Sequence, residues 1–175
     1  MGHANKTEFL PVNIAVLTVS DSRTPEDDRS GDTLVERLEG AGHKLAARAI
    51  VKDETDLIAG KLQEYVDDPE IDAVLATGGT GVTGRDVTPE ALAQVAEKDI
   101  PGFGELFRMV SYEKIKTSTI QSRAAAGVAG GTYLFALPGS PGACKDAWDE
   151  ILVHQLDIRT RPCNFVEMMP RLKEK

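Results

Sequence analysis

The chain has 175 residues, 41% of them hydrophobic, and a formal net charge of −8, so we expect one globular domain with a single core. An acidic chain without a basic stripe does not favour nucleic acid, and the apolar runs are too short to span a bilayer. We therefore expect a cytoplasmic protein that binds neither nucleic acids nor membranes.

The predicted elements alternate between strands and helices. Residues 1–11 are expected to be a flexible tail, and 12–175 a single domain. Runs rich in apolar and β-branched residues predict strands at 13–20, 44–51, 71–77 and 132–138. Helical periodicity predicts helices at 30–42, 55–68, from 88 onward, at 102–116, at 118–129 and from 140 onward. This order predicts a three-layer α/β/α sandwich with a mostly parallel central sheet.

Three helix starts carry recognisable capping signals. Thr55 precedes one helical pattern, Thr88 is followed by a proline and an acid, and Ser140 is followed by Pro141. We expect each of these hydroxyls to cap a helix.

The stretch "VLATGGTGVTGRDVTPEAL", residues 74–92, leaves a strand through four glycines, Gly78, Gly79, Gly81 and Gly84, with Thr80 among them. Glycine allows positive φ and leaves backbone N–H groups uncovered, which suits an anion held by backbone donors. A tight turn between a strand and a helix is the alternative, but four glycines are more than one turn needs.

Further loops follow the other predicted strands, at the sheet edge where ligands collect in open parallel sheets. The loop of Pro138, Gly139 and Ser140 could place an anion at a helix start, or Ser140 could simply cap that helix. Asp53 and Asp86 each follow a strand and could together hold a divalent cation against phosphate oxygens, or could be capping or solvated acids.

Cysteine and histidine do not indicate a site. Cys144 and Cys163 are far apart and without a CxxC pattern, and His3, His43 and His154 are isolated from them and from one another. No disulfide framework, zinc site or Cys–His nucleophile is therefore expected.

Several motifs together resemble the MoaB/MogA family of molybdenum-cofactor biosynthesis proteins. They are "TGGTG", "RDVTPEA", "PGFGELFR", "TSTIQSRAAAGV", "LPGSPGA" and "QLDIRTRPCNF", and the resemblance as a whole covers about residues 12 to 166. The segment "RTRPCNF" is similar to the MoaB branch in particular. The resemblance implies a molybdopterin-binding domain and Mg²⁺-dependent adenylylation of molybdopterin by ATP, with pyrophosphate as the second product.

The resemblance also implies roles for single residues. Asp53 and Asp86 would be the catalytic, metal-binding acids. Ser20 and Asp21 would line the nucleotide side of the cleft, Gly78–Gly81 would hold phosphate, and Ser118 with the loop 138–142 would receive the pterin phosphate end. Arg85 could contact a phosphate, or could be an ordinary surface residue. Some members of the MoaB branch lack the acid-bearing "RD" and "DE" patterns, whereas this chain has both.

Two other functions stay open: a non-catalytic molybdopterin-binding or scaffold module, and another α/β enzyme acting on a nucleotide or sugar phosphate. The resemblance implies a homo-oligomer, a trimer or a hexamer, and a downstream molybdenum-insertion protein as a partner. The apolar content of 99–129 and 157–170 also suggests assembly, because a monomer would expose too many of these side chains: Phe103, Leu106, Phe107, Met109, Phe165, Met168 and Met169. The first four could equally fold back onto their own domain, whereas the last three lie in a tail that we do not expect to form part of a core.

Overall fold

The computed structural model describes residues 8–174. Most of the expected tail at 1–11 lies outside these residues, and within the described part Phe9 packs on His43 with ring centroids 5.1 Å apart. None of the helices between residues 8 and 174 is long and apolar enough to cross a membrane.

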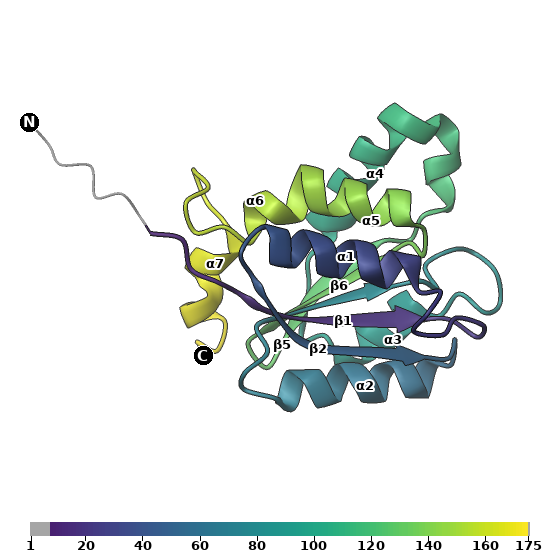
Figure 1. Ribbon diagram of the computed structural model, residues 1–175, viewed down its shortest axis with the longest axis horizontal. Helices are drawn as coiled ribbons and strands as arrows, with labels where there is room; N and C mark the ends of the chain where they lie inside the picture. Colours follow the sequence, from purple (N-terminus) through teal and green to yellow (C-terminus); the bar gives the residue numbers. More distant parts are fainter. Residues whose placement is uncertain (1–7, 175) are drawn as a thin grey trace, which may run out of the picture.

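A mixed sheet forms the centre of the molecule (Figure 1). Its strands lie in the order β2-β1-β3-β6-β5-β4. The first four of these run parallel, whereas β5 is antiparallel to β6 and β4 is antiparallel to β5. The strand bounds are β1 (Asn13–Val19), β2 (Lys44–Val51), β3 (Ala73–Thr77), β4 (Lys98–Asp99), β5 (Ala125–Ala129) and β6 (Thr132–Leu137).

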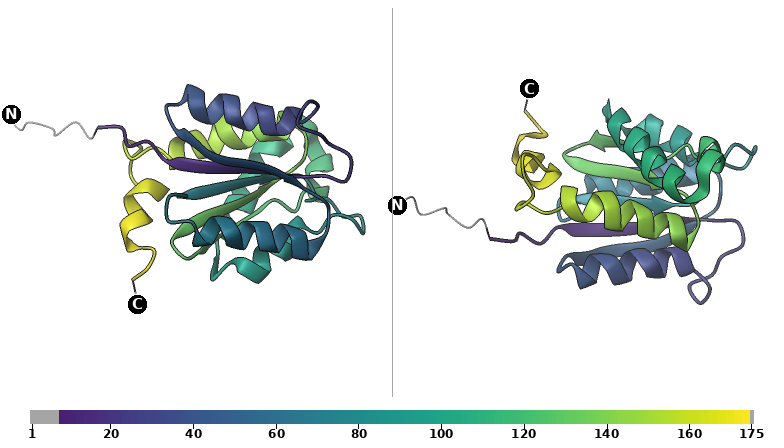
Figure 2. Two further views of the ribbon diagram at one scale, coloured as in Figure 1. Left: turned by 60° about the horizontal axis from the view of Figure 1, so that its bottom comes forward. Right: turned by 90° about the horizontal axis from the view of Figure 1, so that it is seen from above.

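Helices cover both faces of the sheet, as the sequence predicts (Figures 1 and 2). One face carries α1 (Arg29–Gly40), α4 (Pro101–Ile115) and a third helical segment. This segment consists of α5 (Pro141–Ala147), a π turn at 148–152 and α6 (Val153–Gln155). The other face carries α2 (Thr55–Asp67) and α3 (Thr88–Val95). A 3₁₀ turn, Lys116–Gln121, follows α4, and the chain ends with α7 (Phe165–Met168) and a 3₁₀ turn, Met169–Arg171.

Two apolar clusters, one on each face, make up the core. Along β1, Ile14 and Val16 join the cluster under α1 and α5, whereas Ala15 and Leu17 join the one under α2. Successive side chains of a strand point to opposite faces, so a strand buried on both sides reads as one continuous apolar run. This explains why the run at 13–20 predicts a strand without polar alternation.

The predicted helix at 118–129 is wrong. The 3₁₀ turn ends at Gln121 and the strand β5 occupies Ala125–Ala129. The run of alanines favours a helix locally, but tertiary packing overrides that preference. A Cβ at Gly127 would lie 2.7 Å from the Ala96 Cβ and 2.9 Å from the Lys98 carbonyl oxygen, so the small residues allow β4 and its neighbours to approach the strand closely.

Two of the three capping predictions are also wrong. Thr55 and Thr88 are the first residues of their helices, and neither α2 nor α3 has a side-chain cap. The Thr88 hydroxyl donates instead to the Gly78 carbonyl at 2.7 Å, which ties the start of α3 to the glycine loop. Ser140 caps α5 as predicted, accepting a hydrogen bond from the Ala143 amide at 3.2 Å.

The C-terminal segment packs on its own chain, contrary to the expectation that it would not form part of a core. The Phe165 ring lies 4.6 Å from that of Tyr133, whose hydroxyl donates to the Phe165 carbonyl at 3.0 Å. Met169 packs against the same apolar cluster, whereas Met168 is exposed. Phe103 and Phe107 of α4 are likewise buried in their own chain.

Candidate functional site

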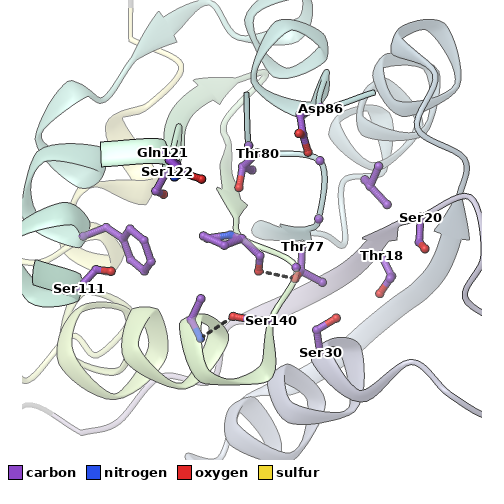
Figure 3. Close-up of a pocket in the computed structure, with 18 of the residues that line it drawn as sticks. Thr18, Ser20, Ser30, Thr77, Thr80, Asp86, Ser111, Gln121, Ser122 and Ser140 are labelled. Atoms are coloured by element: carbon purple, nitrogen blue, oxygen red, sulfur yellow. Dashed lines mark hydrogen bonds between the residues drawn. The ribbon is translucent and has the colours of Figure 1, made fainter. Parts of the chain in front are cut away.

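A cavity of about 440 Å³ opens at the carboxyl ends of β1, β3 and β6 (Figure 3). Parallel strands end at this edge, so their loops meet around one space. Most of the residues singled out in the sequence line this cavity: Ser20, Gly78, Gly79, Thr80, Gly81, Asp86, Pro138, Gly139 and Ser140.

The other predicted site residues lie outside its lining. Asp21 lines a neighbouring cavity of about 620 Å³, next to Arg48 and Lys52. Asp53 lines neither cavity, and Ser118 is exposed on the 3₁₀ turn after α4. The loops after β1, β3 and β6 thus meet at one cavity. Asp53, in the loop after β2, lies next to Gly79 but does not line the cavity.

Gly78 and Gly79 are required by the backbone itself. Their φ values are +106° and +65°, and a Cβ at Gly78 would lie 2.2 Å from the Val19 carbonyl oxygen. A Cβ at Gly79 would lie 2.4 Å from the Thr88 hydroxyl and 3.1 Å from Asp53 Oδ1. Side chains are therefore excluded on the side of the loop that packs against β1 and α3.

The backbone amides of this loop are only partly used. Gly78 donates to the Leu137 carbonyl at 2.9 Å, whereas the amides of Gly79 and Thr80 donate to no residue between 8 and 174. Backbone donors without a protein partner are uncommon away from water, and adjacent ones form a concavity suited to an anion. The glycine loop thus presents two available donors where it lines the cavity.

Three acids surround the loop, and their pKa values differ. The Thr83 hydroxyl, which donates to Asp86 at 2.6 Å, lowers the pKa of Asp86. A bidentate pair with Arg85 lowers the pKa of Asp21. Burial raises the pKa of Asp53, and the negative charge of Asp21 raises it further. Arg85 is engaged with Asp21 and does not line the cavity.

The donor set fits magnesium only together with a phosphate ligand. Within the described part of the chain, no three His, Cys, Asp or Glu side chains are grouped as a metal site. Magnesium in nucleotide sites uses one or two carboxylates, with phosphate oxygens and water completing the shell. Asp53 and Asp86 suit that arrangement, because burial and the negative charges of Asp21 and Asp86 raise the pKa of Asp53, and a bound cation would offset that repulsion.

The sequence reading missed part of the cavity wall. Phe107 of α4 lines the cavity. Ser111 of the same helix and Ser122, after the following turn, line the side opposite Ser20 (Figure 3). Ser111 is buried, four residues after Phe107 on the inward face of the helix. A serine in an apolar stripe is a signal that could have found this wall. Arg123 was also missed: its Nε donates to the Gly81 carbonyl at 2.6 Å, and the residue itself does not line the cavity.

Comparison with known proteins identifies the family. A family described as a probable molybdopterin binding domain matches residues 15–158. Molybdenum cofactor biosynthesis protein B of Escherichia coli K12 is 49% identical over 168 residues, covering 96% of this chain and 97% of that protein. The chain belongs to this family. The Bacillus subtilis protein of the same name is 48% identical over 83% of this chain and 86% of its own length.

Solved structures agree with this assignment. A crystal structure of a molybdenum cofactor biosynthesis protein B is 38% identical, with a TM-score of 0.85 over 95% of this chain and 98% of that chain. The tungsten cofactor synthesizing protein MoaB from Pyrococcus furiosus is 34% identical, with a TM-score of 0.72 over 81% of this chain and 91% of its own. The family resemblance and the α/β fold expected from the sequence motifs are confirmed.

Proposed function

We propose that the chain acts in molybdenum cofactor biosynthesis by adenylylating molybdopterin with ATP and Mg²⁺, giving adenylyl-molybdopterin and pyrophosphate. The observation that carries the proposal is the pair of available amides at Gly79 and Thr80, in a cavity that Asp86 also lines. Family membership supplies the pterin substrate. Donors for phosphate beside an acid for its counter-ion suit transfer at the α-phosphate of a nucleotide.

The reaction needs alignment and charge stabilisation rather than a protein nucleophile. A phosphate oxygen of molybdopterin attacks the α-phosphorus of ATP, and the bond to the β-phosphate oxygen breaks to release pyrophosphate. The loop amides stabilise the charge on the phosphate oxygens, and the acids Asp53 and Asp86 would hold Mg²⁺. The ion supplies charge neutralisation on the triphosphate.

The two substrates are assigned to opposite ends of the cleft. Ser20 and Asp21, after β1, are proposed to face the nucleotide, and the loop at 138–142 the phosphate end of the pterin. Ser118 stays a prediction at that end, although Ser111 and Ser122, not Ser118, line the cavity on that side. The product would pass to a molybdenum-insertion protein.

A non-catalytic molybdopterin-binding module is the second candidate. Two observations favour it: Asp53 lies outside the cavity lining, and Asp86 Oδ2 already accepts hydrogen bonds from the Thr83 amide and hydroxyl. A binder would need the cavity but not both acids.

Pyrophosphate release separates the two candidates. The protein is incubated with ATP and Mg²⁺, with and without molybdopterin, and pyrophosphate is measured, while calorimetry records pterin binding. We expect release that depends on all three components. Pterin binding without any release would select the binding module, and absence of pterin binding would contradict both.

Replacing Gly79 with alanine is expected to weaken pyrophosphate binding at least about tenfold, because the new Cβ meets Thr88 and the positive φ costs about 1–3 kcal/mol. Gly84→Ala is the matched control, since Gly84 has open space around its Cα and lies in the same loop. Calorimetry on both variants measures the difference. Equal affinities for the two variants would argue against a role of this turn in anion binding.

We also propose a closed homo-oligomer, with a trimer as its unit and a hexamer as the leading form. An apolar patch on α4 and the following turn supports this: Leu106, Met109, Tyr112, Ile115 and Ile120 are all exposed. Soluble monomers rarely leave such a patch uncovered. Light scattering should give about six times 18.9 kDa, and a variant with Met109→Lys should give a smaller mass. A monomeric wild-type protein would overturn this.

A further inference from the structure

Two consecutive carbonyl groups of the glycine loop are held by one residue, Thr88. Its hydroxyl donates to the Gly78 carbonyl at 2.7 Å, and its backbone amide donates to the Gly79 carbonyl at 3.0 Å. Thr88 and Gly78 are both buried, and a buried carbonyl group needs a hydrogen-bond partner of this kind. The start of the loop is thereby fixed to the start of α3.

Thr88 can make both contacts because of its place in the helix. It is the first residue of α3, and the first amides of a helix have no partner within that helix. Its amide is therefore available to the Gly79 carbonyl, while its hydroxyl donates outside the helix to Gly78.

The two contacts determine the direction of the next two amides. The peptide bonds of this loop are trans, and in a trans peptide the C=O of one residue and the N–H of the next point in opposite directions. The Gly78 carbonyl points to Thr88, so the Gly79 amide points away from Thr88. The Gly79 carbonyl directs the Thr80 amide in the same way. Thr88 does not line the cavity, whereas Gly79 and Thr80 do.

Arg123 acts further along the loop. Its backbone amide donates to the Thr80 carbonyl at 2.9 Å, and its Nε donates to the Gly81 carbonyl at 2.6 Å. These carbonyls belong to the peptide groups whose amides are those of residues 81 and 82. The two amides that are available to a ligand, those of Gly79 and Thr80, therefore depend on Thr88.

We propose that Thr88 is a positioning residue, which directs the amides of Gly79 and Thr80 toward a phosphate group bound in the cavity. The inference rests on the proposed function for the phosphate ligand but not on turnover. Thr88 does not touch the ligand in this account, and its effect passes through the two peptide groups that it holds.

The test measures binding of inorganic pyrophosphate to the full chain by calorimetry. Thr88→Val keeps the shape of the side chain but removes the donor to the Gly78 carbonyl. It is expected to weaken binding at least about tenfold, because the Gly79 amide is no longer held in the direction of the charged ligand. Thr88→Ser keeps the hydroxyl group and should bind pyrophosphate nearly as well as the wild type.

Thr132→Val is the matched control. Thr132 is also a buried threonine, and its hydroxyl donates to a backbone carbonyl, that of Ile71, at 3.1 Å. It is the first residue of β6, whereas the cavity lies at the carboxyl end of that strand, and it does not line the cavity. The same substitution thus removes the same kind of bond, and pyrophosphate affinity should stay unchanged.

A second readout follows the two amides separately. In ¹⁵N spectra of the wild type, saturating pyrophosphate should shift the amide signals of Gly79 and Thr80. In Thr88→Val the shift of Gly79 should shrink more than that of Thr80, because the Thr88 backbone amide still holds the Gly79 carbonyl. Equal reductions at both amides would overturn the proposal, and so would the absence of these shifts in the wild type, a result that needs no variant.

Equal losses of affinity in Thr88→Val and Thr132→Val would overturn the proposal in favour of a general effect on stability. Wild-type affinity in Thr88→Val would overturn it too. A loss in Thr88→Ser as large as that in Thr88→Val would assign the effect to packing of the methyl group and would likewise overturn it. The proposed adenylylation can fail without affecting this test, because pyrophosphate binding requires no reaction.

Discussion

Replacing Asp86 with asparagine is expected to lower turnover at least about a hundredfold while pterin affinity stays nearly the same. The carboxylate lines the cavity, and it is the charge on this group, rather than its size, that the proposed reaction uses. Asparagine keeps an oxygen that can accept from the Thr83 amide, so the turn at 83–86 should persist. Steady-state kinetics give the turnover, and calorimetry gives the pterin affinity.

Glu54→Gln provides the control for this prediction, because Glu54 is an exposed acid near the same sheet edge. Its turnover should match that of the wild type. Equal losses of turnover and pterin affinity in Asp86→Asn would argue against a charge-stabilising role for Asp86 and for a general disturbance of the loop.

Replacing Asp53 with asparagine should lower turnover to a similar extent, about a hundredfold, although Asp53 lies outside the cavity lining. Burial and the charge of Asp21 raise the pKa of Asp53. The ionised Asp53 carboxylate therefore destabilises the folded protein when no cation is bound. The variant should therefore be at least as stable as the wild type, and thermal unfolding can check this. A loss of turnover in a protein of undiminished stability is the pattern of a functional charge.

The double variant tests whether the two acids serve one ion. If both hold the same Mg²⁺, the second substitution removes little that the first has not already removed, and the two losses should not multiply. Fully multiplied losses would contradict a shared ion and assign the acids independent roles. Wild-type turnover in Asp53→Asn alone would contradict a role of Asp53 in the reaction.

The strands and most helices could be predicted because their signals are local. A run such as 13–20 is apolar throughout because β1 is buried on both faces, and Ser140 with Pro141 starts a helix by its own chemistry. The strand β5 could not be predicted in this way. The alanines of Ala125–Ala129 favour a helix locally, and the close packing of Gly127 against Lys98 is a contact between segments far apart in the sequence. The hydroxyl of Thr88 bonds to the glycine loop rather than to its own helix, a partner ten residues away that no capping rule includes.

The candidate site was predictable as a set of loops but not as a set of contacts. The rule that loops meet at the carboxyl edge of the strands brings Ser20, Gly79, Asp86 and Ser140 to one cavity. It does not say that Arg85 turns to Asp21, or that Arg123, more than forty residues beyond Gly79, donates a hydrogen bond to the Gly81 carbonyl. These are side-chain partners chosen by packing.

Label transfer from ATP tests the account most directly. The protein is incubated with molybdopterin, Mg²⁺ and ATP labelled either in the α-phosphate or in the γ-phosphate, and the pterin product is isolated. Adenylylation predicts that the α-label appears on the pterin and that the γ-label appears only in pyrophosphate. A pterin that binds to the protein but carries neither label would contradict the account.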